Sequence, residues 1–166
     1  GTSTNGSAAF GGSVNIQTNA ASEEASFEIN NTLGSFNTIK NSVGFSTGFI
    51  NDKFELSGRL SRIKSSGYID RSGSRLNSYF LQAIFRDSNT LVKLLNFAGH
   101  EITDQAWFGI DSSKLNTNRK YNSAGEYYDS NGDTKYYDNQ DDNYKQDHYQ
   151  FHWNQSYGSG WISNFG

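Results

Sequence analysis

The chain has 166 residues, of which 34% are hydrophobic, and its mean hydropathy of −0.75 makes a large compact interior unexpected from composition alone. It contains no Cys, which excludes a disulfide framework and cysteine-based chemistry, and its net charge of −3 offers no basic field to attract a nucleic acid, so no nucleic-acid partner is expected. Aromatic residues reach 15% beside abundant Gly, Ser, Asn and Thr, a mixture that favours strands and turns over disorder.

The ends of the chain and its hydropathy profile bear on its context. No Met occurs and both terminal residues are glycine, so we expect a segment of a longer protein. No stretch approaches the roughly 20 apolar residues of a membrane helix. A membrane β-barrel escapes that test, because its strands alternate in segments of about 10 residues between turns. Alternation is therefore the informative pattern.

The N-terminal part is rich in Gly, Ser, Thr and Asn and ends in a strand-like run, Ser13-Val14-Asn15-Ile16-Gln17-Thr18. We interpret residues 1–18 as a glycine-rich turn that leads into a short strand. Residues 19–25, which include Glu23 and Glu24, form a polar, acidic linker. A domain boundary is predicted there.

Three strands with a period of two are predicted between residues 26 and 61. In the first, one face carries Phe27, Ile29 and Leu33. In the second, one face carries Ile39, Asn41, Val43, Phe45, Thr47 and Phe49. In the third, which follows Asn51-Asp52-Lys53, one face carries Phe54, Leu56, Gly58 and Leu60. A helix would mix these apolar positions with the polar positions between them.

Four further strands follow, the first two with less clear faces. Around residues 76–86, Tyr79, Leu81, Ala83 and Phe85 share a face, but Phe80 and Ile84 lie on the other. Residues 90–102 are apolar on both faces at first, and the pattern does not determine their register. The next strand is clear, with Tyr149, Phe151 and Trp153 between His148, Gln150, His152 and Asn154. A last strand begins near Trp161.

The connections alternate in length. Minimal turns at 51–53, 87–89 and 158–160 alternate with longer links at 34–37, 64–75 and 103–143. Bacterial barrels have this asymmetry, because their periplasmic turns are short and their extracellular loops are long. The predicted fold class is therefore all-β: residues 26–166 form about seven strands of a large transmembrane antiparallel β-barrel, with a long extracellular loop at 103–143. A soluble β-sandwich is the alternative.

Several segments resemble TonB-dependent outer-membrane receptors of the Bacteroidetes type. Residues 1–18 resemble the final motif of the plug domain, and the others are Phe27-Glu28-Ile29-Asn30-Asn31, Gly58-Arg59-Leu60-Ser61, Gly67-Tyr68-Ile69-Asp70 and Asp147-His148-Tyr149-Gln150-Phe151-His152. The resemblance spans essentially the whole chain. It implies that residues 1–18 are the C-terminal end of a plug and that the whole protein is a 22-stranded barrel with a plugged lumen.

The same resemblance implies transport without catalysis, in the outer membrane of a Gram-negative bacterium. The substrate would be a scarce nutrient, a small molecule or metal chelate, and the partners would be outer-membrane lipid and the TonB energy-coupling complex, reached through a segment upstream of Gly1. The Ala-Asn-Gly-Val type of motif that ends the plug in the polyglycan-importing branch is missing, which favours a ferric siderophore, haem or similar chelate. The alternatives are a passive porin-like channel and a soluble β-rich binding or adhesion module.

The 103–143 loop mixes aromatic and acidic residues. Tyrosine offers flat apolar area with a polar tip at low entropy cost, which suits a hydrophobic chelate, a sugar or a tetrapyrrole. The alternative is that these side chains pack the loop on itself or lie at the lipid headgroups. The candidate ligand-binding residues are Trp107, Phe108, Tyr121, Tyr127, Tyr128, Tyr136 and Tyr137.

Charged residues within the strands are assigned by their parity. Glu28, Lys40, Glu55 and Arg59 are expected to face the lumen and to contact the plug or one another, because a base near the midplane of the lipid face costs about 2–4 kcal/mol. Arg62 has the lipid-facing parity near a strand end, where it is expected to reach the headgroups.

Other polar clusters predict no metal, cofactor or catalytic group. Residues 129–133 resemble the start of a calcium loop but lack its closing Glu, so we predict an Asn-Gly hairpin turn. The acidic residues 138–142 are interpreted as a solvated loop tip. His148 and His152 would lie about 13 Å apart on one strand face, too far to chelate one ion.

Overall fold

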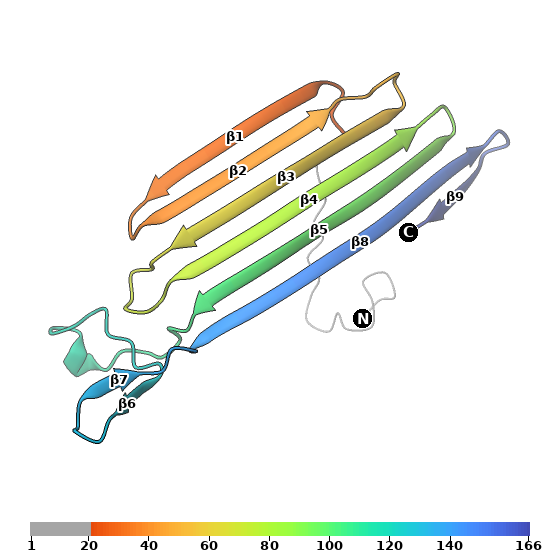
Figure 1. Cartoon of the computed structure of the whole chain (residues 1–166). Helices are drawn as coiled ribbons and strands as arrows, with labels where there is room; N and C mark the ends of the chain where they lie inside the picture. The colour runs from red at the N-terminus through yellow and green to blue at the C-terminus, as the bar shows by residue number, and fades with distance from the viewer. Residues whose placement is uncertain (1–20) are drawn as a thin grey trace.

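The structure, a computed structural model, describes residues 21–166, so the plug interpretation of residues 1–18 and the start of the predicted linker lie outside the described residues. The fold is all-β: seven strands form one open antiparallel sheet in the order β1-β2-β3-β4-β5-β8-β9 (Figure 1). The strands are β1 (Ala25–Gly34), β2 (Thr38–Thr47), β3 (Phe54–Ser65), β4 (Ser74–Arg86), β5 (Thr90–Asp104), β8 (Asp141–Tyr157) and β9 (Trp161–Phe165).

The link between β5 and β8 has secondary structure of its own. It contains a 3-10 turn, η2 (Ser112–Lys114), and a hairpin of β6 (Glu126–Tyr128) and β7 (Thr134–Tyr136). The predicted Asn-Gly turn is confirmed, because the side chain of Asp129 accepts bonds from the backbone of Asn131 and Asp133, and Gly132 has φ 80°. Asp104 pairs with Asp141, so the two long strands extend into the predicted loop, and residues 105–140 connect them.

The register aligns the apolar positions of neighbouring strands on one side of the sheet, since directly paired residues lie on the same face. Across β1 to β5, for example, each residue in the series Ile29, Val43, Leu60, Tyr79 and Ala98 pairs with the next. We call the side to which these residues belong the apolar face. Its large members are Phe27, Ile29, Leu33, Ile39, Val43, Phe45, Phe54, Leu56, Leu60, Tyr79, Leu81, Phe85, Val92, Leu94, Ile102, Tyr149, Phe151, Trp153, Tyr157, Trp161 and Phe165. The opposite side is the polar face.

The faces of β4 and β5, which the pattern left open, follow from the register. Gly58 pairs with Leu81 and Ala83 pairs with Leu94, so these residues belong to the apolar face. Phe80, Ile84, Leu95 and Phe97 therefore lie on the polar face, where Ile84 and Leu95 are buried. Asp87 helps to set the connecting turn: the backbone amides of Asn89 and Thr90 donate to its carboxylate, and the bond from Asn89 is the main cause of its lowered pKa.

The predicted continuation of the second strand to Phe49 is wrong. β2 ends at Thr47, because Gly48 has φ 63° and lies so close to the start of β1 that a Cβ there would meet the backbone N of Ala25 at 2.7 Å. The chain then turns through Asn51 (φ 52°) and Asp52 (φ 58°), the two positive φ values that a tight hairpin turn of type I′ requires. Phe49 lies instead under the guanidinium of Arg86, 3.4 Å from its ring centre.

Burial is slight for a sheet of this size. The buried hydrophobic residues of the described part are Ile84, Leu95, Ala98 and Ala124, whereas Phe27 is 69%, Leu60 63% and Tyr149 77% exposed on the apolar face. Links 35–37, 66–73 and 105–140 leave the sheet at one end, and links 48–53, 87–89 and 158–160 leave it at the other (Figure 1). The predicted lengths are wrong for the first two links, because 35–37 is shorter than 48–53. In the described part of the chain no helix is long and apolar enough to cross a membrane.

Candidate functional site

The end of the sheet that carries links 35–37, 66–73 and 105–140 is organised around Asn122. This side chain is buried at 3% exposure, although it belongs to a loop. Its Nδ2 donates to the carbonyl oxygens of Asp70, Arg71 and Gln105 at 2.9, 3.3 and 2.9 Å, and its Oδ1 accepts from the amide of Ala124. One amide thus joins the 66–73 link to both ends of the segment that precedes the β6–β7 hairpin.

Arg71 adds a second connection between the same segments. Its guanidinium donates to the carbonyl oxygen of Asn122 and lies over the ring of Tyr136 at 3.5 Å from the centroid. The backbone of Asp70 also donates to the carbonyl of Lys120. The hairpin is therefore held against the 66–73 link by charge, ring and backbone contacts.

The first link joins the same assembly. Phe36 packs edge-on against Tyr68, with ring centroids 5.5 Å apart, and its carbonyl accepts from the amide of Ser66. The ammonium of Lys120 lies 5.6 Å from the centre of the Tyr68 ring. The three links at this end of the sheet therefore form one connected platform, which consists of residues 35–37, 66–73 and 105–140.

Within this platform, the carboxylate of Glu126 accepts hydrogen bonds from tyrosine hydroxyls. Tyr121 donates to its carboxylate at 2.6 Å, and Tyr136 and Tyr128 lie within 3.4 Å of it. Tyr121 and Tyr136 are only partly exposed. Of the seven predicted ligand-binding residues, these two therefore serve the packing of the loop on itself.

The other five predicted residues are exposed. Trp107 is 72%, Phe108 61% and Tyr128 68% exposed. Tyr127 and Tyr137 stack with ring centroids 4.5 Å apart across the base of the hairpin and keep 36% and 60% of their surfaces exposed. A platform with exposed rings of this kind can bind a flat or apolar ligand.

The polar face carries a hollow that the residue pattern did not predict. Its volume is about 530 Å³, and its floor consists of the small residues Ser61, Ser78 and Gly99. Its walls include Phe80, Phe97, Glu101, Tyr144 and His148, with the rings of Phe97 and His148 stacked at 4.6 Å. The signal in the sequence was the run of apolar residues on the second face of β4 and β5, which becomes interpretable only with the register.

The four predicted polar contacts all lie on the polar face. Glu55 is buried at 3% exposure, accepts from Ser46 Oγ at 2.9 Å and lies 3.5 Å from Gln82 Nε2. Glu28, Lys40 and Arg59 are exposed. Among the described residues no ion pair joins any two of the four, so their expected mutual pairing is not observed.

Two further observations concern partners and relatives. Within residues 21–166 no group of three or more His, Asp and Glu side chains is arranged to hold a metal ion. Comparisons with models of protein families, with curated proteins and with solved structures find no match to the chain.

The contact between Tyr121 and Glu126 predicts an unusual tyrosine titration. The hydrogen bond to the carboxylate raises the pKa of Tyr121 to about 12, because ionisation would break the bond and place two negative charges together. Since the folded-state pKa is raised, the contribution of this contact to stability is complete below the ordinary tyrosine pKa of about 10 and is lost as the pH rises through the raised value. Ultraviolet titration of the folded protein should show one late tyrosine step that disappears in Tyr121→Phe.

The substitution Glu126→Gln is the matched test of that cause. It removes the charge but keeps the shape, and the pKa of Tyr121 should fall back toward its ordinary value. A late step of unchanged midpoint in Glu126→Gln would contradict the assignment.

Proposed function

We propose that this chain forms part of the wall of an outer-membrane β-barrel of the TonB-dependent receptor type. The protein would import a scarce nutrient. The absence of the Ala-Asn-Gly-Val type of motif favours a ferric siderophore, haem or similar chelate as that nutrient. The observation that carries the proposal is the apolar face: a continuous antiparallel sheet exposes most of its large apolar side chains on one side. Exposed apolar area of this extent requires a partner or a lipid environment.

The lengths of strands and links support a barrel rather than a sandwich. β2 to β5 have 10, 12, 13 and 15 residues, enough for the roughly 9–11 residues with which a tilted strand crosses a bilayer. The apolar face is not matched by an equally apolar opposite face, because Glu28, Lys40, Glu55 and Arg59 lie there. A polar interior and an apolar exterior are typical of outer-membrane barrels.

The platform and the hollow on the polar face support ligand capture. Both lie toward the end of the sheet that carries links 35–37, 66–73 and 105–140, the platform beyond the strand ends and the hollow between β3 and β8. A ligand bound by Trp107, Phe108 and the stacked tyrosines would next meet Tyr144, Glu101 and Phe97 on the polar face. Capture followed by inward passage is the order that an importer needs.

Uptake by living cells tests the function. A strain that lacks the protein should lose uptake of its chelate under iron limitation, and a strain that lacks TonB should lose it equally. The double substitution Trp107→Ala/Phe108→Ala should lower uptake at limiting ligand about tenfold, because each buried aromatic contact contributes roughly 0.5–1.5 kcal/mol or more. Membrane levels of the variant protein should be unchanged, as measured by immunoblotting.

The rival functions give different results in the same experiments. Uptake that persists without TonB indicates a passive channel. Recovery of the native protein in the soluble fraction without detergent indicates a binding or adhesion module. Normal growth and uptake of the deletion strain would remove the iron-chelate assignment.

A further inference from the structure

A line of polar residues crosses six strands on the apolar face. The register places its members directly opposite one another, in the order Asn31, Asn41, Arg62, Asn77, His100 and Lys145. We call this line the polar row. Toward the short turns, the neighbouring line of paired residues is apolar from Ile29 to Ala98 and ends at Asp147. The polar row therefore borders the apolar surface on the side of the platform.

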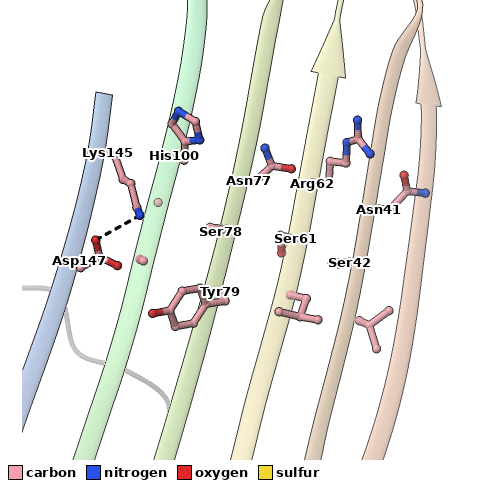
Figure 2. Close-up of a pocket in the computed structure, with 14 residues that line it drawn as sticks. Asn41, Ser42, Ser61, Arg62, Asn77, Ser78, Tyr79, His100, Lys145 and Asp147 are labelled. Atoms are coloured by element: carbon pink, nitrogen blue, oxygen red, sulfur yellow. Dashed lines mark ion pairs between the residues drawn. The ribbon is translucent and has the colours of Figure 1, made fainter. Parts of the chain in front are cut away.

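A hollow of about 600 Å³ lies along the polar row (Figure 2). Val43, Leu60, Tyr79 and Ala98 line its apolar part, and the small side chain of Ala98 between Tyr79 and Asp147 helps to create the depression. The polar row supplies the remaining wall, and Figure 2 shows Arg62 from β3, His100 from β5 and Lys145 from β8 along one side of it.

The local charge is opposite in sign to that of the whole chain, whose net charge is −3. The polar row and the two lines of paired residues beside it contain the bases Arg62, Lys64, Arg75 and Lys145 but only one acid, Asp147. Lys145 and Asp147 are 4.0 Å apart and well exposed, a separation at which pairing is weak.

Arg62 is the strongest indication of a ligand. Its side chain is exposed and makes no ion pair or hydrogen bond with another described residue. Asn77, its direct neighbour in the polar row, likewise has no described side-chain hydrogen bond and offers amide donors. A base beside apolar residues at the border of a lipid-facing surface is favoured where an anion can meet it.

We propose that the polar row binds the phosphate-bearing headgroup of an anionic lipid in the outer leaflet. This site rests on the proposed function, because it requires the apolar face to meet lipid. Arg62 and Lys145 lie three strand spacings apart, roughly 14 Å, and the amide of Asn77 lies between them. His100 also lies between them, but its Nε2 atom is hydrogen-bonded to Oδ1 of Asn143 at 2.8 Å. An extended headgroup with more than one anionic or hydrogen-bonding group can contact Arg62, Asn77 and Lys145.

The acyl chains of the same lipid have a place beside the headgroup. A second hollow on the apolar face, of about 430 Å³, begins one residue pair closer to the short turns and is lined by Leu56, Leu81, Ala83, Leu94 and Phe151. Tyr79, Ala98 and Asp147 of the first hollow are followed on the same strand faces by Leu81, Asn96 and Tyr149 of the second. Headgroup and chain can therefore bind along one continuous path.

Native mass spectrometry of the detergent-purified, delipidated full-length protein tests the site. Phosphatidylglycerol should be retained at higher collision energy than phosphatidylcholine of the same chains, because only the former has a net negative headgroup. The double variant Arg62→Gln/Lys145→Gln should bind phosphatidylglycerol about tenfold more weakly, since each base near a membrane surface adds to the attraction of an anionic lipid and the variant lacks two of them. The matched control Lys53→Gln/Arg119→Gln removes the same charge outside the polar row and should bind like the unchanged protein.

Heat-dependent gel mobility, a property of folded barrels, is measured on every variant, so that loss of folding is distinguished from loss of lipid. An Arg62→Lys variant keeps the charge and should retain most of the binding. Equal retention of both lipids by the unchanged protein, or equal phosphatidylglycerol binding by the double variant and its control, would overturn the site while leaving the receptor function intact. Displacement of phosphatidylglycerol by millimolar inorganic phosphate would also overturn it, because it would identify a site for free anions.

Discussion

Replacing Phe151 by Arg is expected to abolish assembly of the protein into the outer membrane. Phe151 lies on the apolar face of β8, is 44% exposed and pairs with Leu94, away from both ends of the strand. Near the middle of a bilayer an arginine on the lipid face costs about 2–4 kcal/mol, a factor of roughly 30 or more in the assembly equilibrium. The measurement is the fraction of protein that shows the heat-dependent gel mobility of a folded barrel.

The neighbouring substitution Gln150→Arg is the matched control. Gln150 is exposed on the polar face of the same strand, so the same charge is added on the side that the proposal assigns to the lumen. This variant should assemble normally. In water the two substitutions would differ little, because a phenylalanine that is 44% exposed can be replaced at small cost. Equal assembly of both variants would therefore favour the soluble binding module.

The strands and their faces were predictable wherever one face is apolar and the other polar. The alternation in residues 27–33, 39–47 and 54–60 predicted β1 to β3, and the register confirms their shared apolar face. The lengths of the later links, 66–73 and 105–140 against 87–89 and 158–160, likewise follow the prediction, whereas 35–37 and 48–53 do not, because β2 ends earlier than its pattern predicted. These features are local, since each depends on residues two apart or on the length of one connection.

Features that depend on distant pairing were not predictable. β4 and β5 are apolar on both faces, and only their pairing with β3 and β8 assigns Leu81 to one face and Phe97 to the other. Phe49 continued the period of two, but the close approach of Gly48 to β1 ends the strand before it. The pattern of apolar and polar residues does not predict contacts of this kind between separate strands.

The candidate site likewise has some features that the local sequence predicts and others that depend on contacts between distant segments. The aromatic richness of the long loop left ligand capture and packing of the loop on itself as alternatives, and five of the seven named residues are exposed. The pattern could not show which of the seven residues pack inside the platform, because the packing of Tyr121 and Tyr136 depends on Glu126 and on Arg71 from another link. The role of Asn122 was equally hidden: an asparagine between Tyr121 and Ser123 gives no signal that its amide will join three distant carbonyls.

Substitution of Asn122 by Ala is expected to release the platform from the sheet without affecting assembly into the membrane. Its amide satisfies the carbonyls of Asp70, Arg71 and Gln105 in a buried position. Buried polar groups that lose their partner cost about 1–3 kcal/mol, so the closed platform should lose roughly a factor of 5 to 150 in population. Limited proteolysis of whole cells should cut residues 105–140 faster, and ligand affinity should fall by a similar factor because the exposed rings lose their fixed arrangement.

A second variant separates this effect from a general loss of stability. Asn122→Asp keeps the oxygen that accepts from Ala124 but places a charge against three carbonyl oxygens, so it should open the platform at least as far as Asn122→Ala. Lys135→Gln, at an exposed position in the β6–β7 hairpin, should change neither proteolysis nor affinity. Because the strands are paired independently of this amide, heat-dependent mobility should be the same in all three variants. Loss of mobility in Asn122→Ala would show that the platform supports the whole sheet, and unchanged proteolysis would show that Arg71 and the backbone contacts hold it without Asn122.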